Sequence, residues 1–385
     1  MKKHIHIPRF IWEALILIAL LVIVFGLLGT RMGAGNMMNT ITHTAHDLLL
    51  NTVFFLMGIT VLSGAFGKLL VEFGVVRIIE KILRPLMKPL FGLPGVAALG
   101  AVLTFLSDNP AIISLAKDKQ FASYFKKYQL ISLTNFGTAF GMGLVVIAFM
   151  IGQGFSTGAF VGLAGAVVGG LISTRLMQLF VLKSHPEYKL APAIEEGYKT
   201  NESALLKDSE SKDSVFIRAL NAILDGGKVG VELGLAIIPG VLIISTAVMM
   251  MTFGPAGEEG QYIGAAYEGV PILPYLADKI DRFFKALFGF ESPELVAFPI
   301  TALGAVGAAL GLVPRFIEVG IIDNNAIAVF TAMGMCWSGY LSTHTAMLDS
   351  LGYRKLTGKA IAAHTIGGLC AGVFAHWLYV LVSIL

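Results

Sequence analysis

The chain has 385 residues, of which 56% are hydrophobic and only 14% are charged, and its formal net charge is +3. This composition is too apolar for an ordinary soluble domain and indicates a membrane protein, with the lipid bilayer as its surroundings. The nearly balanced charge gives no reason to expect a nucleic-acid partner.

Apolar runs of about 20 residues, the length that crosses a hydrocarbon core, recur along the chain. They lie at 10–29, 46–66, 128–151, 158–182, 229–252, 324–345 and 360–385. The first run follows Lys2 and Lys3 without a small-residue cleavage site after it, which favours an uncleaved signal anchor over a removed signal peptide. We therefore predict an all-α polytopic membrane protein with about seven transmembrane helices.

Two more apolar stretches, near 95–125 and 293–317, are broken by polar or glycine-rich segments. If the first of them crossed the membrane, several lysines and the long polar segment after residue 182 would lie outside, against the usual bias toward cytoplasmic basic residues. If both stretches are instead re-entrant hairpins, most basic residues lie in the cytoplasm, as is usual. With this topology we predict a multi-pass protein of the bacterial inner (cytoplasmic) membrane, with a cytoplasmic N-terminus and the C-terminus outside.

With two re-entrant hairpins, both halves of the chain have the same element order in opposite orientations, which is typical of transporters. Each half has an amphipathic segment that ends in a similar motif, Lys-Pro-Leu-Phe-Gly-Leu-Pro at 88–94 and Lys-Ala-Leu-Phe-Gly-Phe-Glu at 285–291. The predicted domains are a signal-anchor helix (1–44), a first repeat (45–182), a cytoplasmic linker with a lead-in helix (183–228) and a second, inverted repeat (229–385).

The apex of the first hairpin is the strongest candidate for a functional site. Ser107, Asp108 and Asn109 precede Pro110 there, where a broken helix frees backbone groups near the middle of the bilayer. A carboxylate at this depth is costly unless it is paired, protonated or facing water, so we expect Asp108 to contact a solute or a coupling ion. The alternative is that Asp108 caps the helix that follows.

Two of the expected spans carry polar side chains that could contact a solute. They are Thr134, Asn135 and Thr138 in the first half, and Ser338, Ser342, Thr343 and His344 in the second. For the first group the alternative is hydrogen bonding between packed helices, which Ser, Thr and Asn commonly provide. For His344, a proton relay or a solute contact stands against a purely structural histidine.

Two further carboxylates, Glu232 and Asp323, open expected spans of the second half. Together with Asp108 they are the candidates for coupling to Na+ or H+, although a carboxylate near a helix start also serves as a cap or dipole partner. Cys336 and Cys370 lack the spacing of a metal or redox site. The sequence has no nucleotide-binding loop or nucleophile motif, so we expect no cofactor, no metal and no catalytic residues.

These motifs resemble the Gate, or nucleoside-recognition, family. The resemblance rests on the amphipathic helix, Leu-Phe-Gly-Leu-Pro, a small-residue hairpin and Ser-Asp-Asn-Pro at 107–110, and it covers 45–175 and 225–385 as two fused Gate units. The family includes spore maturation proteins A and B and the membrane part of ferrous-iron transporters, and it is distantly similar to concentrative nucleoside transporters. It implies a transport-like core with solute contacts at the hairpin apex and at Asn135.

The chain departs from the family in two ways. It has no GTPase domain, which argues against the iron-transporter mechanism, and its second hairpin has no acidic apex, which argues against a symmetric grip on the solute.

We expect a secondary transporter or facilitator of a small polar solute, nucleoside-like or another small metabolite, that works by alternating access. The alternative is a membrane scaffold or assembly factor for envelope or spore maturation that transports nothing. A membrane enzyme would need an acid and base pair, for which His344 and Asp108 are the candidates. A homo-oligomer is compatible with each of these roles.

Overall fold

The computed structural model describes residues 9–194 and 213–384, which form helices and turns apart from one isolated bridge between Lys126 and Pro192. Six helices in these ranges are long and apolar enough to cross a membrane. They are Phe10–Met32, Ala34–Glu72, Lys127–Gly152, Ser156–Ser184, Val215–Met250 and Arg354–Ile384. The predicted class, an all-α polytopic membrane protein, is confirmed.

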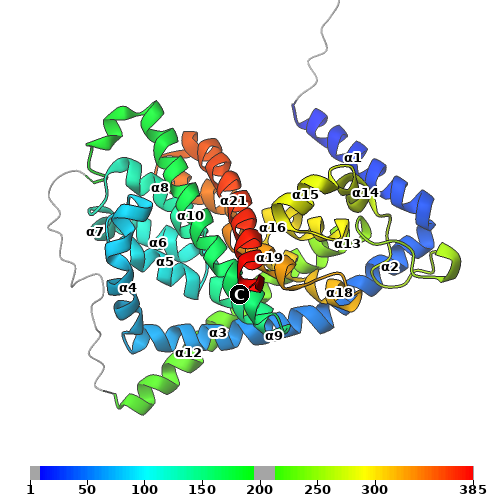
Figure 1. The fold of residues 1–385 in the computed structure, drawn as a ribbon, viewed down its shortest axis with the longest axis horizontal. Coiled ribbons are helices and arrows are strands. Elements are labelled where there is room, and N and C mark those ends of the chain that lie inside the picture. The colour runs from blue at the N-terminus through cyan, green and yellow to red at the C-terminus, as the bar shows by residue number, and fades with distance from the viewer. Residues whose placement is uncertain (1–8, 195–212, 385) are drawn as a thin grey trace, which may run out of the picture.

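The first half begins with a long helix that ends in a sharp turn. Its first elements are α1 (Arg9–Met32), α2 (Ala34–Asp47), a π-helical turn (Leu48–Val53), α3 (Phe54–Glu72) and the amphipathic helix α4 (Val75–Leu86). From α2 to the end of α3 the chain is one helix of 39 residues. Gly74 then turns the chain with a left-handed φ of 71°, so α4 crosses the end of α3 instead of extending it (Figure 1).

A hairpin and a broken helix follow α4. The elements are α5 (Ala97–Leu106), α6 (Pro110–Lys117), α7 (Lys119–Ala122), α8 (Lys127–Thr138), α9 (Gly143–Gly152) and α10 (Ser156–Ser184). The tip of the first hairpin lies between α5 and α6. The helix break between α8 and α9 includes Met142, which adopts a left-handed φ of 54°.

The second half repeats this order. Its elements are α12 (Val215–Pro239), α13 (Thr246–Met250), α14 (Ile272–Asp278), α15 (Asp281–Phe288), α16 (Ala297–Gly304), α17 (Val306–Leu310), α18 (Val313–Glu318), α19 (Asn324–Cys336), α20 (Tyr340–Ser350) and α21 (Thr357–Ile384). The expected continuous span at 324–345 is therefore two helices, because Gly339 takes a left-handed φ of 60° between α19 and α20. The predicted lead-in helix is α12, whereas 195–212 of the predicted linker lies outside the described residues.

Backbone landmarks recur at matching positions in the two halves. Gly92 and Gly289, with φ of 67° and 64°, follow the two amphipathic helices. Gly92 is as far from Met142 in sequence as Gly289 is from Gly339, so each left-handed turn is followed at the same interval by a left-handed helix break. Each half is thus built of an amphipathic helix, a hairpin, a broken helix and a long helix.

Side chains from the broken and long helices satisfy the carbonyls exposed at both of these turns. Arg175 and Gln178 of α10 and Gln129 of α8 donate to carbonyls that follow α4, with N···O distances of 2.6 to 2.9 Å. In the second half, Asn325 of α19 donates to the carbonyls of the last residue of α15 and the next, at 2.9 and 3.0 Å, and a 2.8 Å hydrogen bond to His376 of α21 orients Asn325. Orphan carbonyls at a helix end inside a membrane require such donors.

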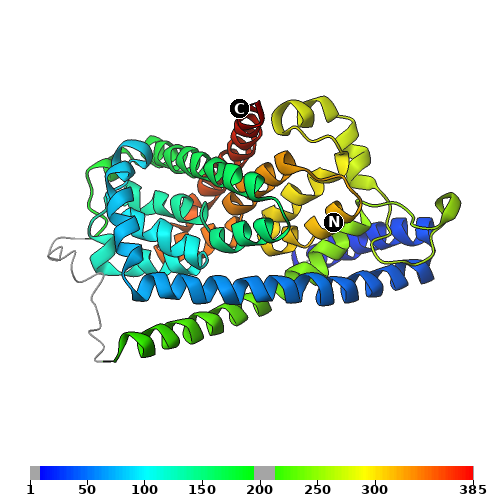
Figure 2. The same cartoon turned by 60° about the horizontal axis from the view of Figure 1, so that its bottom comes forward.

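Glycines let the long helices approach closely. A Cβ on Gly169 of α10 would lie 2.8 Å from the Gly367 carbonyl of α21, and a Cβ on Gly64 of α3 would lie 2.4 Å from the Gly226 carbonyl of α12. Small residues at such contacts are typical of packed membrane helices. The pairs α10–α21 and α3–α12 accordingly lie side by side (Figures 1 and 2).

The loop that joins α13 to α14 is organised by one buried carboxylate and docks on α2. Glu268 is 1% exposed and accepts hydrogen bonds from four backbone N–H groups of this loop, at 2.7 to 3.1 Å. Beside it, Tyr267 donates its hydroxyl to Asp47, and burial together with this bond raises the pKa of Tyr267.

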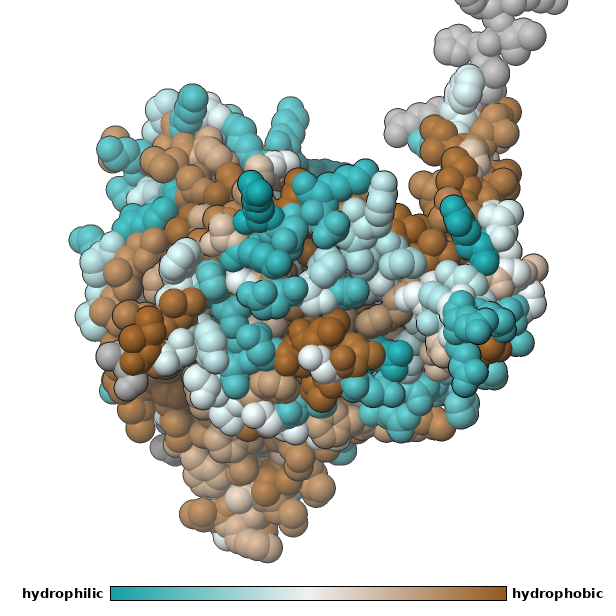
Figure 3. Space-filling view, turned by 45° about the vertical axis from the view of Figure 1, so that its right-hand side comes forward, coloured by the Kyte–Doolittle hydropathy of each residue, from teal (hydrophilic) through white to brown (hydrophobic). Residues whose placement is uncertain are grey.

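Apolar side chains cover much of the outer surface, as contact with lipid requires. Helix α1 is the clearest case, since Phe10 and Ile23 are 69% and 67% exposed. Figure 3 shows this apolar helix standing beside a hydrophilic face of the molecule.

Candidate functional site

A cavity of about 350 Å3 lies where the two hairpin tips meet the two helix breaks. The first half contributes Asp108, Asn109, Pro110, Ile113 and Met142, and the second half contributes Leu233, Ala236, Ile237, Gly240, Ala305, Val306, Gly307, Ala308, Ser338, Gly339, Ser342, Thr343 and Ala346. Residues far apart in sequence therefore share one site.

The tip of the first hairpin lies between the two helix breaks and contacts both. Asn109 is 5% exposed, and its side-chain amide donates to the carbonyl of Ser338 in the second break. On its other side Asn109 meets the first break so closely that a Cβ on Gly141 would lie 2.3 Å from the Asn109 Oδ1. Pro110 can open α6 because the first residue of a helix needs no N–H donor.

Two acceptor atoms at this tip lack a partner among the residues that the structure describes. The Oδ1 atoms of Asp108 and Asn109 are both buried and accept no hydrogen bond in the described part of the chain. Buried polar atoms are almost always hydrogen-bonded, so these two acceptors could pair with a donor or a cation from outside the protein.

The tip of the second hairpin reaches the same cavity with apolar side chains. The helix stops at Gly304, Ala305 is extended with φ −164° and ψ 125°, and α17 begins at Val306. Ser245 holds this tip by donating to the carbonyl of Ala308 at 2.7 Å. The second hairpin therefore contributes shape and apolar surface to the cavity.

The second helix break adds hydroxyl groups to the cavity. Ser342 donates to the carbonyl of Gly339 at 2.9 Å, which satisfies one carbonyl at the break. Ser338 and Thr343 are 2% and 7% exposed and line the cavity beside it. Five of the predicted solute-binding residues are thus brought together here, namely Asp108, Asn109, Ser338, Ser342 and Thr343.

The predicted polar face of α8 is not part of this cavity. Asn135 donates at 2.9 Å both to the Ser173 hydroxyl of α10 and to the carbonyl of Ala360 in α21. Thr138 donates to the carbonyl of Thr134 within its own helix, at 2.7 Å. This placement fits the alternative interpretation, in which these side chains join packed helices.

Ser107 and His344 also lie away from the cavity lining. Ser107 donates to the carbonyl of Leu103 at 2.7 Å. His344 is a fully buried residue of α20, with its ring centroid 4.6 Å from that of His364. His344 is therefore positioned as a neighbour of a second histidine, and it does not line the cavity.

The two other predicted coupling carboxylates are also absent from the cavity lining. Glu232 is exposed in the interior of α12, because that helix begins at Val215 and not near residue 229 as expected. Asp323 caps α19 by accepting from the Ala326 N–H at 2.7 Å, as its alternative role predicted.

Several cavity residues escaped the sequence analysis. Met142 of the first break and Leu233 and Ile237 of α12 have apolar side chains without a distinguishing chemistry. A signal did exist for the break, since Met142 occupies the position in the first half that Gly339 occupies in the second. Among the described residues, no group of three or more His, Cys, Asp or Glu side chains is arranged to hold a metal ion.

A family model described as "Gate: Nucleoside recognition" matches residues 47–154. These residues are therefore similar to a Gate domain. The match extends from the end of α2 to just beyond α9, so it contains the first hairpin tip and the first helix break. An uncharacterized protein of Alkalihalophilus pseudofirmus is 34% identical over 90 residues, which are 23% of this chain and 19% of that protein.

The fold of the chain is similar to that of solved structures of CNTnw, a concentrative nucleoside transporter. The inward-facing, substrate-bound structure has a TM-score of 0.54 at 13% identity, covering 96% of this chain and 86% of that one. A variant in an outward-facing state has a TM-score of 0.52 at 13% identity, covering 96% and 87%. The chain is therefore similar in fold to this transporter.

Proposed function

We propose that this protein is a secondary transporter or facilitator that carries a small polar, nucleoside-like solute across the membrane by alternating access. The observation that carries the proposal is the convergence of two hairpin tips and two helix breaks on one cavity with two orphan acceptors. Discontinuous helices that meet at a repeat interface are the usual setting of a transporter's solute site. The Gate domain and the fold support the same role.

The lining of the cavity points to the chemistry of the solute. Asp108 is its one charged residue, and the described lining contains no Lys, Arg or His. The free Oδ1 atoms of Asp108 and Asn109 suit hydroxyl or amino donors, while Met142 and Ile237 offer apolar surface to a flat ring. A neutral or cationic solute with several donors fits this site better than a phosphorylated or carboxylated one.

Asp108 is the residue that we propose for coupling to Na+ or H+. It stands at the tip that contacts both helix breaks, so loss of its charge, or binding of a cation to it, would act on both halves. In this scheme the two Gate-like units, 45–182 and 229–385, rock against each other around the cavity. The protein would sit in the bacterial inner membrane with its N-terminus cytoplasmic and its C-terminus outside.

The test is uptake by purified protein in proteoliposomes. Nucleosides, nucleobases, amino acids and organic acids would be offered with and without a sodium gradient, and again with a pH gradient. We expect accumulation of a nucleoside-like solute under one of the two gradients, and no uptake of organic acids. If no solute is taken up, and if cells that carry Asp108→Asn still complete envelope or spore maturation normally, the scaffold would be favoured instead.

A further inference from the structure

Two apolar crevices occur outside the solute cavity, one in each half of the molecule. The first, of about 330 Å3, lies between α4, the first hairpin arm α5, the broken helix and α10, and we call it the α4 crevice. The second, of about 290 Å3, lies between α15, the first hairpin arm α16, α19 and α21, and we call it the α15 crevice. Every residue that lines either crevice is apolar.

Both crevices have exposed apolar walls on the outside of the helix bundle. In the α4 crevice, Phe66 and Leu86 are 52% and 44% exposed, and in the α15 crevice Leu276 and Ile300 are 53% and 45% exposed. Such surfaces on a membrane protein face lipid, and an apolar groove of this size next to lipid has room for part of a hydrocarbon chain.

The charges beside the two crevices differ. Lys81 of α4 and Lys88, which follows it, are exposed, and no ion pair is seen for either in the described part of the chain. The single acid of α4, Glu80, is 2% exposed and is bound to Arg84 at 2.9 Å. The helix beside the α4 crevice therefore presents a surplus of positive charge.

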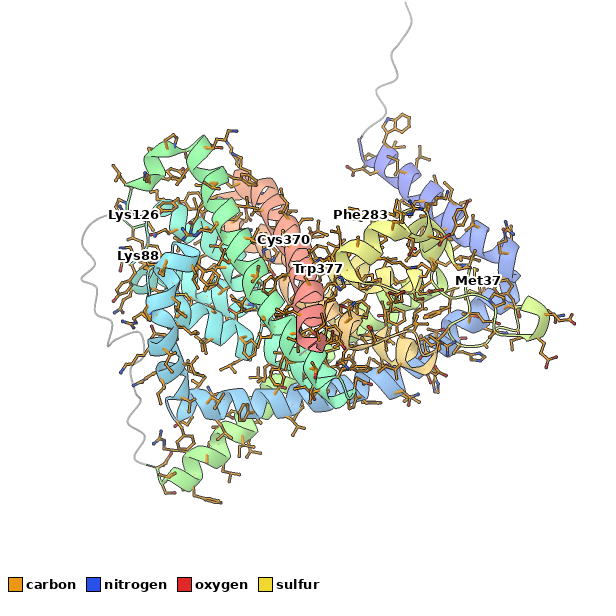
Figure 4. The ribbon with its side chains drawn as sticks, viewed as in Figure 1. Met37, Lys88, Lys126, Phe283, Cys370 and Trp377 are labelled. Atoms are coloured by element: carbon orange, nitrogen blue, oxygen red, sulfur yellow. The ribbon has the colours of Figure 1, made fainter. Side chains whose placement is uncertain are left out.

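Further positive charge lies near Lys88. Figure 4 shows Lys88 and Lys126 at one end of the molecule, and the 2.8 Å bond from Gln129 to the carbonyl of Gly92 joins their two segments. By contrast, the segment 278–291 holds three basic and three acidic residues, and Lys285 of α15 is paired with Asp281 at 3.0 Å, so the amphipathic segment of the second half has no net positive charge.

We propose that the α4 crevice is a binding site for an anionic phospholipid. One acyl chain lies in the crevice, and the phosphate is held at the interface by Lys81 and Lys88, with Lys126 adding to the positive field. An amphipathic helix at the interface and clustered lysines are the two elements that select anionic lipids. The α15 crevice accepts acyl chains without a preference for the headgroup. This proposal does not depend on the transport function.

The experiment compares lipids with the same acyl chains and different headgroups. Protein freed of lipid in detergent is titrated with phosphatidylglycerol, with phosphatidylcholine and with the free headgroup glycerophosphoglycerol, and thermal stability and native mass spectra are recorded. We expect phosphatidylglycerol to raise the melting temperature more than phosphatidylcholine does, and the free headgroup to have little effect. In a Lys81→Gln/Lys88→Gln variant, phosphatidylglycerol binding should weaken by about tenfold, because each basic residue near the lipid surface contributes.

The matched control is the corresponding helix of the second half. A Lys279→Gln/Lys285→Gln variant loses the same formal charge beside the α15 crevice, and its preference for phosphatidylglycerol should be unchanged. Equal effects of the two lipids, an equal effect of the free headgroup, no effect of any of them, or a preference that survives in the Lys81→Gln/Lys88→Gln variant would each overturn the proposal.

Discussion

The first hairpin ends in Ser107, Asp108 and Asn109, whereas the second ends in alanine, valine and glycine at 305–308, and both tips reach the same cavity. The backbone around them is repeated, with left-handed turns and helix breaks at equal intervals. The chemistry is not repeated. The comparison teaches that the repeat supplies the geometry of the site, while one half supplies its charge.

The strongest test of this asymmetry is Asp108→Asn. It removes the one charged side chain of the cavity lining and keeps its size, so uptake of the transported solute should fall by about 100-fold or more while thermal stability stays near that of the unmodified protein. Initial rates in proteoliposomes measure this. Glu232→Gln, on the exposed face of α12, is the control and should leave uptake within about twofold, as surface changes usually do. Full uptake by Asp108→Asn would mean that transport does not depend on the charge of Asp108.

The equivalence of the two turns can be tested with glycine substitutions. In Gly289→Ala the new Cβ would lie 2.4 Å from His376 and 2.6 Å from Asn325, and in Gly92→Ala it would lie 2.3 Å from Arg175. Backbone strain together with disturbed caps should cost about 2–4 kcal/mol in each variant. Chemical denaturation in detergent measures the loss.

Gly320→Ala is the matched control for these glycine variants. Gly320 has a φ of +71° and nothing within 4 Å of its added Cβ, so only the strain of about 1–2 kcal/mol should appear. If Gly92→Ala lowered the free energy of unfolding no more than Gly320→Ala does, the turns at Gly92 and Gly289 would not be equivalent.

The two asparagines sharpen the distinction between cavity and packing. Asn109→Ala leaves the Ser338 carbonyl without its donor, and Asn135→Ala does the same to the Ala360 carbonyl, so each should cost about 1–3 kcal/mol of stability. Only Asn109→Ala should also raise the KM of uptake, by about tenfold, which corresponds to one lost hydrogen bond. An equal rise in KM for Asn135→Ala would place the solute against α8 after all.

The smallest expected effect is that of Asp323→Ala. Loss of this helix cap should lower stability by about 1 kcal/mol without changing the ion dependence of uptake. Asp118→Ala removes a similar cap from α7, where Asp118 accepts from the Phe121 N–H at 2.7 Å, and is the control. A changed sodium or pH dependence in Asp323→Ala alone would make this residue part of the coupling site.

Much of the fold could be predicted from the sequence because the membrane limits which structures a chain can form. Long apolar runs must be helices there, and basic residues indicate which loops stay in the cytoplasm. The helix breaks were harder to predict. The run at 324–345 is apolar enough to span, and its interruption depends on the left-handed conformation of Gly339, which hydrophobicity does not reveal.

Residues of the cavity lining could be predicted where polar residues interrupt an apolar arm, but not where they sit inside a helix. Asp108 and Asn109 stood out because a carboxylate and an amide at a hairpin apex need partners. Asn135 and His344 looked equally polar in sequence, but their orientation around the helix is set by packing against α10 and α21. The hydrogen-bond partner of a polar residue in a buried helix depends on how that helix packs against others, which the local sequence does not reveal.

The hydrogen bond from Asn109 to the Ser338 carbonyl joins residues that lie 229 positions apart. During synthesis at about 5–20 residues per second, Asn109 enters the membrane roughly 10–45 s before its acceptor leaves the ribosome. For that interval the first hairpin holds a carboxylate and an amide in the bilayer region without the half that encloses them. The nascent first half therefore depends on water, a chaperone or the insertion machinery until translation is nearly complete.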